Sequence, residues 1–271
     1  MRDLFFLTCG AISYPAFVIA PSVLKAPMAG LAMSVTVAVV VRDDGQIVLI
    51  DAGLSEEACI SARRVFGLRA AFLGIRAKKG DSVLEQLRAL GFDRELVSTV
   101  VATHLHFDHI GGVCDFPNAE VVCTDHELSA FRSNAQVGYR AEDLAKTGRV
   151  RTVALATDPS YGFPASVDLF GDGEIVLLDA RGHTRGNIAV AIRGPRGCFV
   201  HIGDAAYQSW EYGVSPPGPS LAARMFSWNR PEMMRTYAAI RACEADPRRP
   251  VIVPSHDPVV LEKLPRTPRA S

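Results

Sequence analysis

Short apolar runs alternate with amphipathic stretches along the whole chain. The first residues, MRDLFFLTCG, are expected to form a β-strand. A β-hairpin is predicted next, because two Val- and Ile-rich runs flank Asp44 and Gly45, which are typical of a two-residue turn. Further short strands are predicted at LVSTVVAT (96–103), EIVLLDA (174–180), CFVHIGD (198–204) and VIVPS (251–255).

Helices are predicted between these strands. They are expected at residues 55–72, from Ser82 to Gly91, from Thr124 to about residue 132, and from Asn229 to near Asp246. Ser82 with Glu85, and Thr124 with Glu127, have the spacing of a capping box, in which hydroxyl and carboxylate both bind backbone N–H groups of the first turn. The alternation of strands and helices predicts a layered α/β fold.

Composition narrows the class of protein. The chain has 271 residues, of which 48% are hydrophobic and 21% are charged, so one α/β domain covering residues 1–271 is expected. The 29 Lys and Arg residues balance 29 Asp and Glu residues, which gives a formal net charge of zero. Binding to nucleic acid or to an anionic membrane surface needs excess positive charge, so neither partner is expected.

The cysteines and the apolar runs point to a cytoplasmic protein. The six cysteines are scattered and form no CxxC pair, which is typical of reduced core residues. The apolar stretch at the start is too short for a signal peptide, and no run reaches the roughly 18 residues that a membrane span needs. A cytoplasmic location without a membrane partner is therefore predicted.

The strongest chemical signal is the segment THLHFDHIGG, residues 103–112. Random placement would produce H-x-H-x-D-H in a chain of this composition roughly 3 times in 10,000. Imidazole and carboxylate groups are preferred zinc ligands, and His104 and His106 in an extended segment can point the same way. Asp108 and His109 can then face a second metal ion beside the first. The segment therefore predicts a metal site.

Four predicted strands end in a candidate ligand. His104 follows the first of them, and the other three are followed by His183, Asp204 and His256. In α/β proteins the carboxyl ends of strands meet where sites are built, so we expect these side chains to converge. The remaining histidines, His126 and His201, are predicted to be structural.

These residues resemble the metallo-β-lactamase fold superfamily, whose motifs run Asp, HxHxDH, His, Asp, His in this order. The match covers Asp51 to His256. Within the superfamily, THLHFDHIGG, GDAAY (203–207) and SHD (255–257) are most similar to the N-acyl-homoserine lactone lactonases, which are quorum-quenching enzymes. The resemblance implies a four-layer αβ/βα sandwich.

The resemblance also implies a ligand set for two Zn²⁺ ions, with other divalent transition metals as an alternative. One ion would be held by His104, His106 and His183, the other by Asp108, His109 and His256, and Asp204 would bridge them. Asp51 matches the first motif, where a carboxylate either supports a ligand or shapes the turn after a strand. One departure is Asn187, which stands where many relatives have the second histidine of GHTxGH.

The implied reaction is the opening of a lactone ring by a metal-bridging hydroxide. Asp108 is the candidate for proton transfer to the leaving alkoxide, and Tyr207 is the candidate hydrogen-bond donor to the oxyanion. A glyoxalase II-like thioesterase, or another small-ester hydrolase of this fold, is the alternative. Asn187 and the short C-terminal segment LEKLPRTPRAS disfavour the thioesterase.

Two further segments bear on the substrate pocket and on contacts between subunits. An aromatic-rich segment follows Asp204 and suggests an apolar pocket wall, although ordinary core packing explains each residue equally well: Tyr207, Trp210, Tyr212, Met225, Phe226 and Trp228. The basic segment 63–79 is expected to be a solvated face or a subunit contact, which is compatible with a homodimer.

Overall fold

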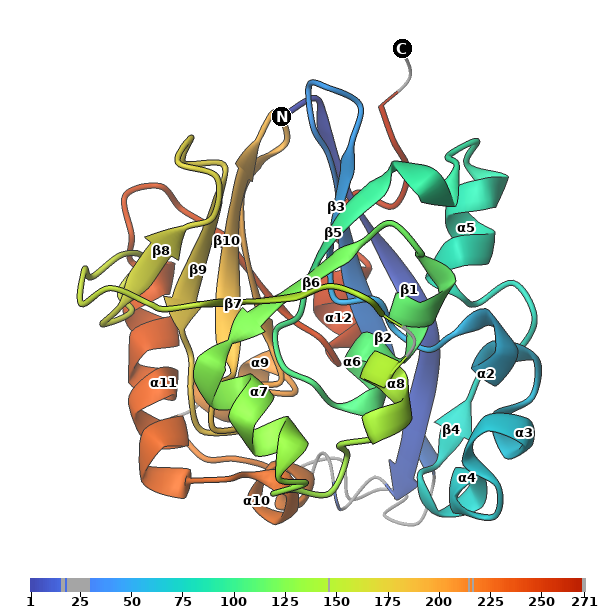
Figure 1. The fold of residues 1–271 in the computed structure, drawn as a ribbon. Coiled ribbons are helices and arrows are strands. Elements are labelled where there is room, and N and C mark those ends of the chain that lie inside the picture. The colour runs from blue at the N-terminus through green and yellow to red at the C-terminus, as the bar shows by residue number, and fades with distance from the viewer. Residues whose placement is uncertain (16–17, 19–29, 146, 214, 216, 270–271) are drawn as a thin grey trace.

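Two β-sheets pack face to face in the computed structural model, which describes residues 1–15, 18, 30–145, 147–213, 215 and 217–269 (Figure 1). Within these residues the first sheet has seven strands in the order β4-β1-β2-β3-β5-β6-β7. They are β1 (Asp3–Pro15), β2 (Gly30–Val41), β3 (Ile47–Ile50), β4 (Ile75–Arg76), β5 (Val97–Val101), β6 (Glu120–Thr124) and β7 (Val150–Val153). The second sheet has five strands in the order β12-β11-β10-β9-β8. They are β8 (Ser166–Asp168), β9 (Ile175–Asp179), β10 (Ile188–Gly194), β11 (Gly197–Gly203) and β12 (Val251–Pro254).

Short helices cover the outer face of the first sheet, and one long helix covers the second (Figure 1). The α-helices are α2 (Glu56–Ile60), α3 (Ala62–Phe66), α4 (Arg69–Phe72), α5 (Val83–Ala89), α6 (Phe107–Ile110), α7 (Asp125–Arg132), α8 (Ala141–Ala145), α9 (Ser209–Gly213), α10 (Leu221–Phe226), α11 (Arg230–Glu244) and α12 (Pro258–Leu261). Two 3₁₀ helices are η1 (Arg94–Leu96) and η2 (Gly111–Asp115). The predicted four-layer αβ/βα sandwich is confirmed.

Strand β1 shows why the sequence builds four layers. Successive side chains of a strand point to opposite faces. Phe5 and Leu7 belong to the core between the first sheet and its helices, whereas Leu4 and Phe6 belong to the core between the two sheets. A strand that buries both faces has a continuous apolar run in its sequence, as LFFL (4–7) shows.

Two predicted elements differ in detail from the structure. The hairpin between β2 and β3 turns through the three residues 43–45 rather than through two, since Arg42 N donates to Gln46 O (2.8 Å). The predicted helix at 55–72 is broken into α2, α3 and α4. Ser61 ends α2 and caps α3 by accepting a hydrogen bond from Arg64 N, and Gly67, with φ of 60°, ends α3.

Strand direction places four chain segments at one end of the sandwich. Strands β9 and β11 both pair antiparallel with β10, and β12 is parallel to β11, so all three end at the same edge of their sheet. The end of β5 joins them, because Ile188 N at the start of β10 donates to Thr103 O (2.9 Å). The loops that follow these four strands are therefore neighbours.

Two further observations concern the cysteines and the lengths of the helices. None of the six cysteines, all of which lie in the described part of the chain, is in a disulfide. Among the described residues, every helix is too short or too polar to span a bilayer.

Candidate metal centre

The loop after β5 carries four of the candidate ligands. His104 lies three residues after the end of the strand, His106 is the N-cap of α6, and Asp108 and His109 lie within that short helix. The rings of His104 and His106 are 4.6 Å apart between centroids, so the two side chains point to the same side, as the sequence predicted. All four residues are buried.

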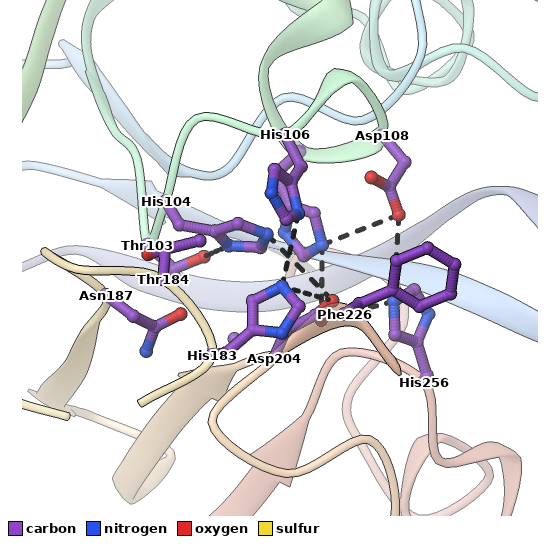
Figure 2. Close-up of polar contacts among 12 residues, drawn as sticks. Thr103, His104, His106, Asp108, His183, Thr184, Asn187, Asp204, Phe226 and His256 are labelled. Atoms are coloured by element: carbon purple, nitrogen blue, oxygen red, sulfur yellow. Dashed lines mark hydrogen bonds and ion pairs between the residues drawn. The ribbon is translucent and has the colours of Figure 1, made fainter. Parts of the chain in front are cut away.

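A first group of ligand atoms comes from two loops. His104, His106 and His183 each offer a ring nitrogen, and these nitrogens lie within 4.8 Å of one another. His183 Nε2 is 3.1 Å from His106 Nδ1 (Figure 2). Burial lowers the pKa of His104 and His106 well below the ordinary value and lowers that of His183 to about 4. The three imidazoles are therefore neutral, which is the form that binds a metal ion.

A second group lies beside the first. Asp108, His109 and His256 offer one ligand atom each, again within 4.8 Å of one another. Asp108 Oδ2 is 3.7 Å from His256 Nε2 (Figure 2). It is also 3.6 Å from His109 Nε2. Although burial opposes it, the Asp204 and Asp108 carboxylates raise the pKa of His109 and of His256. This second group is thus an arrangement of acidic and imidazole groups that a cation would stabilise.

Asp204 lies between the two groups and presents one oxygen to each. Its Oδ1 is 3.2 Å from His109 Nε2 and 3.2 Å from His256 Nε2. Its Oδ2 is 3.5 Å from His183 Nε2 and 3.9 Å from His104 Nε2. Asp204 follows β11, and Gly203 brings this strand end close to the β5 loop, since a Cβ there would lie 2.6 Å from Thr103 Oγ1.

Several of the candidate ligand atoms are buried without a hydrogen bond from the chain itself. His104 Nε2, His109 Nε2 and Asp204 Oδ1 are buried and have no hydrogen-bond partner in the described part of the chain. Buried polar atoms without partners are costly. Two ligands bound to one ion at ~2.1 Å with tetrahedral angles lie about 3.4 Å apart, which is close to the spacing seen here. The donor set therefore fits divalent metal ions.

Asp51 lies behind His109 rather than among the seven candidate ligands. Its Oδ2 is 2.8 Å from His109 Nδ1, and its carboxylate also accepts hydrogen bonds from Thr103 N (2.8 Å) and Thr103 Oγ1 (2.9 Å). The residue has φ of 63°, so the chain turns sharply after β3. Asp51 thus shapes the turn after β3 and also contacts a candidate metal ligand.

The other polar residues singled out in the sequence lie outside the two groups. Asn187 is buried and donates from Nδ2 to Ala180 O (3.1 Å), so it fixes the loop that carries His183. His201 is buried, with Nε2 3.2 Å from Thr36 O, and His126 is exposed on α7.

Tyr207 lies over the metal groups. Its ring centroid is 5.7 Å from that of His183 and 5.4 Å from that of His256. Burial raises the pKa of its phenol well above the ordinary value, and Asp204 and Asp108 raise it further, so the phenol keeps its proton and can donate a hydrogen bond. Tyr207 also lines a small pocket that opens onto Asp108, Asp204 and His256.

Tyr14, at the end of β1, lines the same pocket and was not singled out in the sequence. Burial raises its pKa to about 12, with a contribution from Asp108, and its ring lies 6.3 Å from that of Phe226. A tyrosine near the end of a strand carries no local signal that would have identified it.

A larger groove of about 780 Å³ continues from this pocket. The pocket and the groove share four lining residues: Leu73, Phe107, Val137 and Gly138. Beyond these shared residues, Phe66 and Phe72 form an apolar wall of the groove. This apolar wall belongs to the segment 63–79, for which a solvated face or a subunit contact was expected, and the basic side chains of that segment are exposed.

The aromatic segment after Asp204 contributes less than expected. Tyr207 and Phe226 line the pocket, but Tyr212 is buried in the core beneath α11. Trp228 is 41% exposed and Met225 is 72% exposed, and neither lines the pocket or the groove. The prediction of a pocket wall holds for only part of this segment.

Comparison with known proteins identifies the family of these motifs. The family model described as the metallo-beta-lactamase superfamily matches residues 33–256. A "probable metallo-hydrolase" of Mycobacterium tuberculosis is 31% identical over 244 residues, which cover 84% of this chain and 76% of that protein. The N-acyl homoserine lactonase AttM of Rhizobium radiobacter is 30% identical over 196 residues, which cover 70% of this chain and 69% of the relative.

A solved structure supports the fold. A mutant of AiiA from B. thuringiensis, with N-decanoyl-L-homoserine bound at its active site, superposes with a TM-score of 0.76. The superposition covers 97% of this chain and 96% of that one, at 16% sequence identity. The two chains therefore share their architecture over nearly their full length.

Proposed function

The chain belongs to the metallo-β-lactamase superfamily, and from this membership we propose that it opens the ring of a lactone with two zinc ions. The family and the lactonase relatives make it a metal-dependent ester hydrolase. N-acyl-homoserine lactones, or similar lactones with an apolar part, are the substrates that we propose, and quorum quenching would be the consequence.

The position of Asp204 carries the dinuclear part of the proposal. One of its oxygens lies 3.2 Å from nitrogens of the second group, and the other lies 3.5 Å from a nitrogen of the first. A carboxylate with this placement can bridge two ions, one held by His104, His106 and His183 and the other by Asp108, His109 and His256. Two divalent ions would supply an activated water molecule and polarise the carbonyl oxygen of the substrate.

The chain's own residues would provide orientation and proton transfer. The buried phenol of Tyr207 would donate a hydrogen bond to the carbonyl oxygen as negative charge develops on it. Asp108 would relay a proton to the alkoxide that leaves when the ring opens, because a carboxylate that binds one metal ion through one oxygen keeps its other oxygen free to take up and deliver a proton.

The groove supports a substrate with an apolar tail. It continues directly from the pocket that contains Tyr207 and Asp108, and Phe66, Phe72 and Leu73 form one of its walls. An apolar chain placed there would remove these side chains from water, which favours binding. The lactone ring would then lie over the metal groups, with its acyl substituent in the groove.

Comparison of two substrates with the same acyl group tests the proposal. We expect kcat/KM to be higher for the N-acyl-homoserine lactone than for the corresponding glutathione thioester. A thioester preferred by a factor of ~100, which is about 2.7 kcal/mol of transition-state binding, would instead support a glyoxalase II-like thioesterase. The same chain after removal of its metal ions is the control, and it should hydrolyse neither substrate.

A further inference from the structure

Glu127 is a buried carboxylate of α7 that has no place in the mechanism above. Its side chain accepts four hydrogen bonds and is completely inaccessible to solvent. Oε1 accepts from Leu105 N (2.9 Å) and Tyr139 OH (3.0 Å), and Oε2 accepts from Thr184 Oγ1 (2.6 Å) and Gly186 N (3.0 Å). Such a fully bonded carboxylate in the interior calls for a physical reason.

The donors come from the two loops that carry the first metal group. Leu105 lies between His104 and His106, and Thr184 directly follows His183. We propose that Glu127 is a positioning residue, whose single carboxylate holds these two loops at the separation that the first metal ion requires. The inference rests on the metal-binding part of the proposed function and is independent of the substrate.

Tyr139 adds a further link between Glu127 and a ligand. Its hydroxyl donates to Glu127 Oε1, and its ring lies 5.0 Å from the ring of His106. The backbone next to it also holds the ligand loop, since Phe107 N donates to Gly138 O (3.0 Å). A shift of Glu127 would therefore reach His106 both through Leu105 and through the packed ring of Tyr139.

The second loop rests directly on the start of α7. A Cβ at Gly186 would lie 2.3 Å from Thr124 Oγ1 and 2.3 Å from Glu127 N, so only glycine allows this approach. Thr124 Oγ1 donates to Gly186 O (3.0 Å) and accepts from Glu127 N (3.2 Å). The predicted capping box is thus half correct: the hydroxyl of Thr124 caps the helix, but the carboxylate of Glu127 binds the ligand loops.

The backbone donors around Glu127 require that both oxygens of its side chain accept a hydrogen bond. Each carboxylate oxygen accepts one backbone N–H, from Leu105 or from Gly186, and a backbone N–H cannot reverse its direction. Burial raises the pKa of Glu127, but both oxygens of a protonated carboxyl keep a lone pair for these donors. A glutamine cannot replace the carboxyl, because its NH₂ group would face one of the two N–H groups.

Metal titration of Glu127→Gln tests the inference. Zinc bound by the metal-free chain is measured against a competing chromophoric chelator, while circular dichroism confirms folding. We expect one of the two zinc equivalents to bind ~10- to 100-fold more weakly and the other to keep its affinity. Wild-type affinity for both equivalents, or equal weakening of both, would overturn the proposal.

Asp168→Asn is the matched control. The Asp168 carboxylate also accepts hydrogen bonds from three backbone N–H groups, those of Phe170, Gly171 and Gly173. Asp168 ends β8 beside the start of β9, whereas His183 follows the end of β9. This variant should bind both zinc equivalents as the wild type does. A similar loss of zinc in Asp168→Asn would mean that general destabilisation explains the result, and the proposal would fail.

If Glu127→Gln does not fold, two less disruptive substitutions at Thr184 test the same proposal. Thr184→Val removes one hydroxyl donor, and Thr184→Ser keeps it. We expect the valine variant to weaken the same zinc equivalent by roughly 3- to 30-fold and the serine variant to restore its affinity. Equal affinities in the two variants would contradict the role of Glu127.

These measurements use zinc without substrate. Normal zinc binding by a chain that hydrolyses no lactone would refute the proposed substrate and leave the role of Glu127 standing. A wild-type chain that binds no zinc would refute both.

Discussion

Asp51 and His109 form a buried pair in which Asp51 Oδ2 lies 2.8 Å from His109 Nδ1, while His109 Nε2 faces Asp204 Oδ1 at 3.2 Å. The carboxylate can only accept a hydrogen bond when ionised, so the pair keeps the proton of His109 on Nδ1. The lone pair of Nε2 is then left to face the second metal group. A carboxylate behind a ligating histidine commonly orients the ring and raises its basicity.

Asp51→Asn should therefore weaken the binding of one metal ion. The amide can still accept from Thr103 N, but its NH₂ would face Nδ1 and favour the tautomer that carries the proton on Nε2. We expect ~10- to 100-fold weaker binding of one zinc equivalent, measured by chelator competition. Unchanged binding of both equivalents would show that Asp51 only shapes the turn after β3.

His106→Ala should remove one metal ion together with activity, because its ring belongs to the first group. Metal analysis is expected to give about two ions per wild-type chain and about one in the variant. His126→Ala is the control, since His126 is exposed on α7 and belongs to neither group of ligands. The control should keep about two ions, and loss of metal from it would argue against a local effect.

The convergence of the candidate ligands could be predicted from the sequence, because each of them belongs to a short motif near the end of a strand, whereas their division into two groups was implied only by the family resemblance. His104, His183, Asp204 and His256 follow strands whose ends meet at one edge, and the general rule for α/β sheets was sufficient to bring them together. The contact between Asp51 and His109 needed only the additional fact that β3 and β5 are adjacent and parallel.

The groove and the role of Glu127 could not be predicted, because both depend on contacts between distant segments. Val137 and Phe72 both line the groove although no local pattern relates them. Glu127 has the spacing of a capping box, and only the position of the 183–187 loop shows that its carboxylate points into the interior. Local patterns describe elements well and describe loop packing poorly.

The groove predicts a dependence of specificity on the length of the acyl tail. Phe72 is 79% exposed and lines the groove, so it is free to contact a bound apolar chain. Phe72→Ser should lower kcat/KM about 10-fold for a long-tailed lactone and change it little for a short-tailed one. Ile60→Ser, at a residue that is 55% exposed outside the groove, is the control. Equal effects on both lactones would place the tail elsewhere.

The buried carboxyl of Asp143 should make the stability of the folded chain depend on pH. Burial raises the pKa of its carboxyl to about 7, against the opposing effect of Arg140, with smaller contributions from Glu142 and Asp108. The folded chain therefore holds a proton that the unfolded chain releases near pH 4, so this residue's contribution to stability falls as the pH rises from 4 to 7.

Asp143→Asn should remove this dependence. The melting temperature of the variant relative to the wild type is expected to rise between pH 5 and pH 8, with both proteins measured at the same metal loading. A constant difference across this range would contradict the raised pKa.

Tyr207→Phe separates metal binding from catalysis. The phenol is buried over the metal groups, and its ring lies 5.4 Å from that of His256 without belonging to either group of ligands. If it donates to the developing oxyanion, the variant should keep its metal content and melting temperature and lose ~10- to 1,000-fold in kcat/KM. The metal ions share the stabilisation of the oxyanion, so the loss should not exceed that of a strong single donor. Asp108→Asn should instead lose both rate and one metal equivalent. Unaltered kinetics of Tyr207→Phe on its best lactone would leave this tyrosine as a wall of the pocket.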